Sequence, residues 1–263
     1  MGPSTAPPHD DAFTVHNFED CRNIRSGAVF IIASGQSAKD FPIADFSDVP
    51  MITMNGAIAL FVDTPIRPFF YACTDTHFSI QQPELFAEAL RRSERVALWE
   101  DHFRATHADT HAQVYFLKKA PKPKLADLWL RKDPQLIRYR SLAGCRKKAG
   151  FSKNMARGFF DARTVAYLAL QIAYHAGFSK VFLVGVDLNQ NLPRFYERQG
   201  IERSPCGLDQ HFASRILPSF ELVATSVVDE RFAVYNLSAS SRIPRSVIPY
   251  KTLAEVKALI QTN

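Results

Sequence analysis

The chain of 263 residues contains only four cysteines, and they lie far apart at Cys21, Cys73, Cys145 and Cys206. None of them forms a CxxC pair, so the pattern supports neither a disulfide scaffold nor a zinc ribbon. No apolar run approaches the ~20 residues that a membrane-spanning helix needs. The amino terminus is polar and rich in proline, unlike a signal peptide. We therefore expect a protein of the reducing cytoplasm.

Several common ligand-binding motifs are also missing. The sequence has neither the three glycines of a dinucleotide fingerprint nor the GK[ST] ending of a P-loop. It has no Asp-x-Asp motif for a divalent cation. The pair His107 and His111 could share a helix face, but no matching carboxylate or cysteine ligands lie nearby. We therefore expect no metal site and no cofactor.

Charge is distributed unevenly along the chain. The formal net charge is +6, yet residues 118–157 hold thirteen Lys or Arg against only Asp127 and Asp133. This basic segment therefore carries +11, and the rest of the chain carries −5. Such a patch attracts partners that bear phosphate, such as an anionic membrane surface or a phosphorylated glycolipid. A nucleic acid is not expected, because the interleaved aromatic residues of an RNA-recognition sheet are absent.

Short apolar runs alternate with helical patterns along the chain, and 46% of the residues are hydrophobic, enough for a substantial core. The apolar runs predict strands at 28–33, 50–54, 68–73, 95–99, 113–117, 181–184 and 232–235. Apolar periodicity predicts helices at 84–92, about 165–176, 209 to about 228, and 253–260. This alternation is typical of an α/β fold with a mostly parallel sheet.

We expect one Rossmann-like domain over residues 26–263, with helices on both faces of the sheet. Residues 1–25 show no periodicity and are predicted to form a flexible tail. The basic segment, at about 118–157, contains Pro121, Pro123 and Pro134. It is therefore predicted to be an excursion or lid of short helices rather than a central strand.

Three predicted strands end in small or polar residues. The first runs into the turn 34–37 (SGQS), the second into Asn55 and Gly56, and the third into Thr74 and Asp75. The first of these ends alone is equally well explained as an ordinary turn between a strand and a helix. In open α/β sheets, however, ligands bind beyond the carboxyl ends of the strands, and these ends would lie along one edge. Together they predict a crevice there.

The richest polar strand end follows the apolar run 181–184, within the stretch 153–196 that organises the chain. Its hydrogen-bonding residues are Asp187, Asn189, Gln190, Asn191, Arg194 and Tyr196. A solvated loop with turn-forming asparagines is the alternative interpretation. The last strand also ends in polar residues, Asn236 and Ser238. We take the loop after residue 184 as the best candidate site.

A general base is sought among the titratable residues near these strand ends. His211 falls in the first turn of a helix that Asp209 is expected to cap, on the site side of the fold. A lone histidine is often structural, but its ordinary pKa suits proton transfer near neutral pH. His211 is therefore the first candidate base, and Asp75 is the second.

Short blocks spread over residues 27–250 carry a family resemblance. In chain order they are IIASGQS, ITMNGA, ACTDTHF, RTVAYLALQIAYHAGFSKVFLVGVDL, PRFYE, ILPSF, VYNLS and IPY. They resemble the lipopolysaccharide-core transferases that add a further 3-deoxy-D-manno-oct-2-ulosonic acid (Kdo) to the inner core. More remotely, the SGQS turn, Asn55 and the GVDLNQN block are similar to small bacterial sialyltransferases, which use a CMP-activated keto-sugar acid.

The resemblance implies a glycosyltransferase that moves Kdo from CMP-Kdo to a lipopolysaccharide inner-core acceptor, with inversion and without a metal. It implies a sialyltransferase-like fold, and a cytoplasmic enzyme held peripherally at the inner membrane of a Gram-negative-type cell. Two tyrosines that hold the leaving phosphate in sialyltransferases fall on Asn189 and Phe195, so Arg194 and Tyr196 are expected to replace them. The catalytic histidine falls near His211.

The expected site therefore has two groups of residues. His211 and Asp75 are the candidate catalytic bases. Substrate and nucleotide are expected to contact Ser34, Gly35, Gln36, Ser37, Asn55, Thr164, Asp187, Asn189, Arg194, Tyr196, Asn236 and Ser238.

Two other functions stay open at this point. Pterin diphosphokinase-like enzymes have a similar sheet, and a nucleotide- or lipid-binding module could keep the fold without the base. The basic segment adds an expectation of its own. We expect it to dock the enzyme on acceptor glycolipid or on the anionic inner leaflet, since each Lys or Arg near such a surface contributes about 1 kcal/mol. The alternative is that its cations coat a solvated lid.

Overall fold

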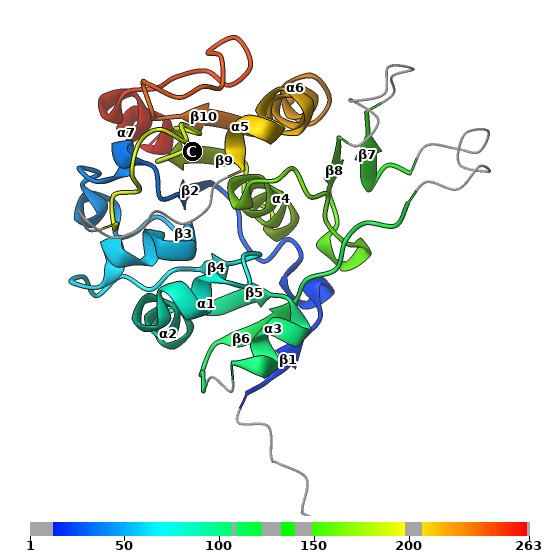
Figure 1. The fold of residues 1–263 in the computed structure, drawn as a ribbon. Helices are drawn as coiled ribbons and strands as arrows, with labels where there is room; N and C mark the ends of the chain where they lie inside the picture. Colours follow the sequence, from blue (N-terminus) through cyan, green and yellow to red (C-terminus); the bar gives the residue numbers. More distant parts are fainter. Residues whose placement is uncertain (1–12, 107–108, 123–132, 140–148, 198–206, 262–263) are drawn as a thin grey trace, which may run out of the picture.

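The computed structural model describes residues 13–106, 109–122, 133–139, 149–197 and 207–261. Eight strands form one sheet in the order β1-β6-β5-β4-β3-β2-β9-β10, and every neighbouring pair is parallel (Figure 1). The strands are β1 Val15–His16, β2 Ala28–Ile32, β3 Met51–Met54, β4 Phe70–Ala72, β5 Arg95–Leu98, β6 Gln113–Phe116, β9 Lys180–Val184 and β10 Ala233–Asn236. A separate antiparallel pair joins β7 Leu136–Arg138 to β8 Gly150–Ser152.

Helices connect these strands. The α-helices are α1 Phe78–Gln81, α2 Pro83–Arg92, α3 Glu100–Ala105, α4 Val165–Ala176, α5 Leu208–His211, α6 Leu217–Ser226 and α7 Leu253–Gln261. Short 3₁₀ turns are η1 Phe18–Cys21, η2 Gln36–Ala38, η3 Ile43–Phe46, η4 Asn55–Phe61 and η7 Met155–Arg157, and the π-helical segment η8 spans Phe212–Ile216.

The sheet is covered on both faces, as its continuous apolar strands predicted. Along β2, Val29 and Ile31 point into one core, and Phe30 and Ile32 point into the other. The first core also contains α4 and α6, which lie to the right of the sheet in Figure 1. The second contains η3, η4, α2 and α7 on the left. The predicted α/β fold with a parallel sheet and helices on both faces is confirmed.

The direction of the chain through the sheet reverses beside β2. From β2 the chain moves to β3, β4 and β5 on one side, whereas β9 and β10 lie on the other. Because all eight strands are parallel, their carboxyl ends lie along the same edge, as expected. The polar ends of β2, β3 and β9 are therefore neighbours, and the boundary between β2 and β9 is the switch point where open α/β sheets bind ligands.

Helix α4 is the buried centre of the first core. Its carboxyl end is Gly177, which has a φ of 99° as the sequence predicted for a helix cap. Gln171 is fully buried in this helix and accepts hydrogen bonds from the backbone N–H groups of Ser152 and Phe160. Its amide nitrogen donates to the carbonyls of Phe160 and Tyr167. One amide thus ties the segment around β8 to α4.

The amino-terminal prediction was wrong for the residues that the structure describes there. Val15–His16 pairs with Val114 and Tyr115 of β6, and Phe18 is buried in the first core. The Asn17 side chain accepts a hydrogen bond from Glu19 N and caps η1. A two-residue strand has no periodicity of its own, so the partner strand determines it, and the ordered chain begins well before residue 26.

The basic segment is described only in part. Residues 123–132 and 140–148, which include Arg146, Lys147 and Lys148, lie outside the described residues. The described part contains the antiparallel strand pair β7 and β8 as well as the short turn η7, and Leu136 of β7 is buried. Two of its cations form ion pairs: Lys119 Nζ lies 3.2 Å from Asp161, and Arg157 lies 2.8 Å from Asp133. Its role as a lid remains a prediction.

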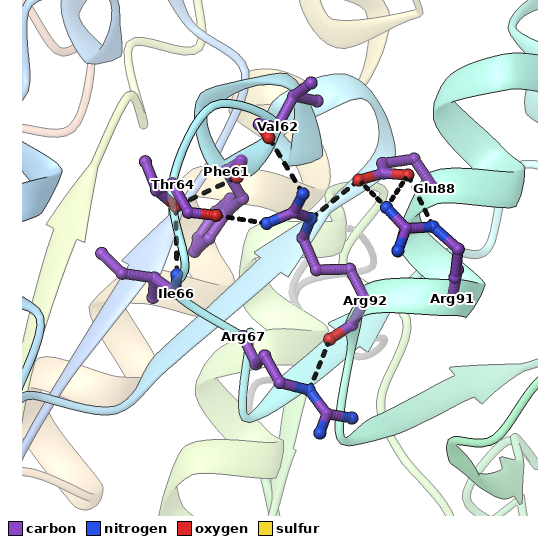
Figure 2. Close-up of polar contacts among 8 residues, drawn as sticks. All are labelled: Phe61, Val62, Thr64, Ile66, Arg67, Glu88, Arg91 and Arg92. Carbon is purple, nitrogen blue, oxygen red and sulfur yellow. Dashed lines mark hydrogen bonds and ion pairs between the residues drawn. The ribbon is translucent and has the colours of Figure 1, made fainter.

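Arg92 ties α2 to the chain that leaves η4 (Figure 2). Its guanidinium donates to the carbonyls of Thr64 and Val62 and to the Glu88 carboxylate, whose Oε1 lies 2.7 Å from Nε. Arg67 Nε in turn donates to the Arg92 carbonyl at 3.2 Å. Because η4 begins at Asn55, this network fixes the far end of a segment whose first residue lies at the edge of the sheet described above.

The helix predicted from Asp209 to about residue 228 is divided in three. It begins as α5 with Gly207 at the N-cap, passes through the π-helical η8, and continues as α6 to Ser226. Asp209 does not cap it, because its carboxylate pairs with Arg242 instead. A π-helical turn inside a helix is frequently associated with a functional site.

Candidate functional site

A cavity of about 370 Å³ opens at the carboxyl edge of the sheet. The loops after β2, β3 and β9 form three of its sides, and the start of α4 and helix α5 close the others. Nine of the fourteen residues predicted for the site line it: Ser34, Gly35, Gln36, Asn55, Thr164, Asp187, Asn189, Arg194 and His211. Strand ends that were separate in the sequence therefore line one cavity.

The turn after β2 packs tightly against the loop after β9. Gly35 N donates to the Gly185 carbonyl at 2.9 Å. A Cβ at position 35 would lie 2.3 Å from that carbonyl oxygen and 2.6 Å from Oδ2 of Asp187. Glycine is required here because two segments of the chain approach each other closely.

A buried hydrogen-bond chain supports this turn. Asp187 is only 3% exposed, and its carboxylate accepts from both the backbone N–H of Ser37, at 3.0 Å, and the Ser37 hydroxyl. The same hydroxyl lies 2.7 Å from Oγ of Ser238, whose N–H donates to the Asn236 side chain. Ser37, Ser238 and Asn236 do not line the cavity. They link the ends of β2, β9 and β10 beneath it.

Asn55 presents an unsatisfied acceptor at the cavity. Its backbone has a φ of 44°, a left-handed conformation that Asn adopts more readily than most residues. Its side-chain Oδ1 is buried and has no hydrogen-bond partner among the described residues. A buried acceptor without a partner costs about 1–3 kcal/mol. An N–H or O–H group of a bound ligand would remove that cost.

Tyr196 lies beside Gly56 rather than in the cavity lining. Its ring occupies the space beside Gly56, where a Cβ would come within 2.2 Å of the ring carbon Cε1. Burial raises the pKa of the Tyr196 hydroxyl, which accepts a hydrogen bond from Arg194 Nη1 at 3.1 Å. Arg194 itself lines the cavity and also lies 3.8 Å from Glu197. The tyrosine thus orients an arginine that faces the cavity.

The start of α4 supplies positive potential. Thr164 is the N-cap residue, and among the described residues its side chain makes no hydrogen bond to the first helical turn. Val165 and Ala166 line the cavity, so the first turn of α4, where helices carry N–H groups without an intrahelical partner, lies at the cavity, as in many anion sites. Arg163 also lines the cavity and has a φ of 65°.

Arg163 was missed from the sequence, together with several other lining residues. An arginine directly before a predicted helix start is a signal for an anion site, since charge and helix dipole act together. The lining residues that were not predicted for the site include Met54, Arg163, Glu197, Gly207 and Leu208.

His211 enters the cavity from α5, and its ring lies near Gly207, where a Cβ would be 3.7 Å from Cδ2. Asp75, the second candidate base, is not in the cavity lining. Its carboxylate accepts from the His77 backbone N–H at 3.0 Å. Burial raises the pKa of the neighbouring Cys73 thiol to about 12, so this thiol is not a ready nucleophile. Of the two candidate bases, the structure places only His211 in the cavity lining.

The fold and the cavity together define a class of protein. This is an α/β protein with a cavity at the switch point of a parallel sheet, where open α/β sheets bind ligands, and two arginines, a helix start and a histidine surround it. The chain belongs to the WaaZ family of 3-deoxy-D-manno-octulosonic acid transferases, whose family model matches residues 15–254. It is a Kdo transferase, a glycosyltransferase of lipopolysaccharide biosynthesis that adds Kdo to the inner core. The family expectation from the sequence is confirmed.

Two curated relatives match over most of their length. A probable 3-deoxy-manno-octulosonic acid transferase of Salmonella typhimurium (strain LT2) is 26% identical over 255 residues, covering 91% of this chain and 89% of the relative. A protein of the same description from Escherichia coli (strain K12) is 26% identical over 249 residues, covering 89% and 85%.

A solved structure of the sialyltransferase CstII from Campylobacter jejuni, in complex with the substrate analogue CMP-3FNeuAc, also aligns with the chain. The identity is 12% and the TM-score 0.40, and the alignment covers 85% of this chain and 88% of that one. A likeness of this degree concerns the fold and carries no residue role. Within the described ranges, no helix is long and apolar enough to cross a bilayer.

Proposed function

We propose that the cavity binds CMP-Kdo and that the enzyme transfers Kdo from it to a hydroxyl of the lipopolysaccharide inner core, with inversion and without a metal. One observation carries the proposal. A single cavity at the switch point combines an unsatisfied amide acceptor, a helix start and two arginines with a histidine. This combination matches a nucleoside monophosphate joined to a keto-sugar acid.

The charged groups of the donor are matched by the cationic side of the cavity. The donor carries a phosphate and a carboxylate close together at the anomeric carbon. Arg163, Arg194 and the first turn of α4 offer positive charge and N–H donors to them. The free Oδ1 of Asn55 suits an N–H or O–H donor of the nucleoside. The Ser34 to Gln36 backbone, held by Gly35 and Asp187, closes the remaining side.

In the proposed mechanism an imidazole nitrogen of His211 takes the proton from the acceptor hydroxyl. The acceptor oxygen bonds to the anomeric carbon of Kdo as the bond from that carbon to the phosphate oxygen breaks. The departing CMP keeps the electron pair, and Arg163 and Arg194 stabilise its negative charge. Proton removal by a positioned base contributes about 10²- to 10⁴-fold in rate.

Metal independence follows from this assignment, because two arginines supply the charge that a cation otherwise brings. The absence of an Asp-x-Asp motif from the sequence supports it. Transfer is expected to persist in EDTA. Loss of transfer in EDTA that magnesium or manganese restores would contradict metal independence.

Membrane attachment is the second part of the proposal, and it is supported by the +11 charge of residues 118–157. We expect the cytoplasmic enzyme to associate peripherally with the anionic inner membrane, where its glycolipid acceptor lies. The test is co-sedimentation with anionic liposomes, with and without phosphorylated glycolipid, over a range of salt. Reversing Arg146, Lys147 and Lys148 to Glu should weaken binding and raise the KM for acceptor. Binding that does not change with salt would contradict it.

Thermal stabilisation by candidate donors tests the function as a whole. A ligand at about 100 times its Kd adds about 2.7 kcal/mol to the free energy of unfolding. We expect stabilisation by CMP and CMP-Kdo, and transfer of Kdo to inner-core acceptor. Stabilisation by ATP with a pterin, and not by CMP, would favour a pterin diphosphokinase-like enzyme. Lipid binding without nucleotide binding would favour a non-catalytic module.

A further inference from the structure

Helix α5, which carries His211 to the cavity, is too short to hold its own position. It spans only Leu208–His211, and the π-helical η8 follows it directly. A single turn of helix has little stability of its own in water. Contacts from other parts of the chain must therefore determine where the imidazole lies.

Arg242 provides several such contacts from the loop after β10. Its Nη1 pairs with Oδ1 of Asp209, two residues before His211, and also donates to the Leu188 carbonyl at 3.2 Å. Its guanidinium lies 4.0 Å from the ring centroid of Phe212, the residue after His211. One planar group thus contacts a residue within α5, the residue that follows it, and the loop after β9.

The backbone around Arg242 is itself anchored to the loop that forms the cavity wall. Arg242 N donates to the Asp187 carbonyl at 3.0 Å, and the Ser241 hydroxyl donates to the Val186 carbonyl at 2.6 Å. The guanidinium therefore connects the wall built around Asp187 to the helix that carries the base.

We propose that Arg242 is a positioning residue for the transfer reaction: it holds α5 so that His211 faces the acceptor hydroxyl. The proposal rests on the proposed role of His211 as the general base. Arg242 does not line the cavity and touches no reacting atom. Its effect is on geometry, and a shift of about 1 Å in a catalytic group costs about 100-fold in rate.

The exposure of the Arg242–Asp209 ion pair allows a positioning role to be distinguished from a purely structural one. The side chains of Arg242 and Asp209 are 35% and 47% exposed. Ion pairs with this exposure contribute little to global stability. Loss of the pair should therefore leave the unfolding temperature almost unchanged while it slows transfer. The expected change is in kcat, with the KM for CMP-Kdo nearly constant, because the arginines that face the donor are untouched.

The experiment measures kcat and KM for Kdo transfer in four variants: Arg242→Gln, Arg242→Lys, His211→Ala and the double variant Arg242→Gln/His211→Ala. Arg242→Gln should lower kcat about 10- to 100-fold. Arg242→Lys should recover part of the loss, since it keeps the charge without the planar fork. In the His211→Ala background, Arg242→Gln should change kcat less than about twofold, because a group that acts through His211 has nothing left to position.

Arg104→Gln is the matched control. Arg104 also pairs with a carboxylate, Glu100 at 3.0 Å, and lies 5.6 Å from an aromatic ring centroid, but it is on α3 beside β6. Its loss should leave kcat unchanged. Asp209→Asn removes the ion pair by changing its acidic partner and should lower kcat as Arg242→Gln does. This second variant keeps the test valid if Arg242→Gln fails to fold.

Normal kcat in both Arg242→Gln and Asp209→Asn would overturn the positioning role. An equal loss from Arg242→Gln with and without His211 would also overturn it. Normal kcat in His211→Ala overturns something different, the assignment of the base within the proposed function. The two failures are therefore distinguishable.

Discussion

Replacing Gln171 with Leu should destabilise the protein more than any surface change. Gln171 is fully buried in α4 and uses all of its side-chain hydrogen-bonding groups. In Gln171→Leu, the N–H groups of Ser152 and Phe160 and the Phe160 carbonyl lose this partner inside the core.

The magnitude follows from these three groups. Each buried polar group left without a partner costs about 1–3 kcal/mol. The added apolar surface of Leu returns about 1–2 kcal/mol. Three such groups cost about 3–9 kcal/mol, so after the gain from Leu we expect the free energy of unfolding to fall by about 4 kcal/mol, a large share of the about 5–15 kcal/mol of a typical domain. With an m-value of about 3 kcal/mol/M, the urea midpoint should fall by about 1.3 M.

The assay is urea unfolding followed by far-UV circular dichroism. Gln171→Met, which keeps the length of the side chain without its amide, should lower the midpoint as much as Leu does. Gln261→Leu, at the exposed end of α7, is the control and should leave it unchanged. If Gln171→Leu and Gln171→Met both unfold at the urea concentration of the unaltered protein, the inferred role of this amide is refuted.

Three further predictions concern the pH dependence of stability, the turn around Gly35 at the cavity, and the hydrogen bonds of Arg92 that tie α2 to the chain after η4. Burial lowers the pKa of His175 below its ordinary 6.5, so its contribution to stability is present above about pH 6.5 and is lost as the pH falls toward the folded-state pKa. His175→Gln should flatten the dependence of the urea midpoint on pH between about 7.5 and 5, and an unchanged slope would contradict this. Gly35→Val should lower both CMP affinity and the unfolding temperature, because the side chain collides with the Gly185 carbonyl and the Asp187 carboxylate. If calorimetry shows normal CMP affinity, the turn around Gly35 is not part of the donor site. Arg92→Ala should lower the free energy of unfolding, measured by urea titration, by about 2–4 kcal/mol, because the hydrogen bonds of the guanidinium to Glu88 and Val62 are lost. A change near zero would show that these hydrogen bonds do not stabilise the fold.

The strands and the fold class could be predicted because their signals are local. The apolar run of β2, the periodicity of α4 and Gly177 after it each depend on neighbours within a few residues. The parallel topology then implied that polar strand ends meet, which is why Ser34, Asn55 and Asn189 were expected at one site and do line one cavity.

The errors arose where a distant partner decides the local structure. Val15–His16 is a strand only because β6 pairs with it, about a hundred residues later in the chain. Asp209 is a good N-cap by sequence, yet Arg242 takes its carboxylate. The amino-acid order carries no signal for such partners, since they are brought together by the packing of the whole chain.

The same distinction applies within the site. Residue types and motif blocks in the sequence predicted the family, the α/β fold and nine of the residues that line the cavity. Packing decided which of these residues face the cavity and which support it. Ser37 does not line the cavity; it holds the turn after β2 through hydrogen bonds to Asp187, 150 positions away, and Ser238, 201 positions away. Tyr196 does not line the cavity itself, because its ring fills the space beside Gly56, and its hydroxyl accepts a hydrogen bond from Arg194, which does line it. Composition and spacing specify which side chains reach the edge of a sheet, whereas close packing between remote segments decides which of them face the ligand.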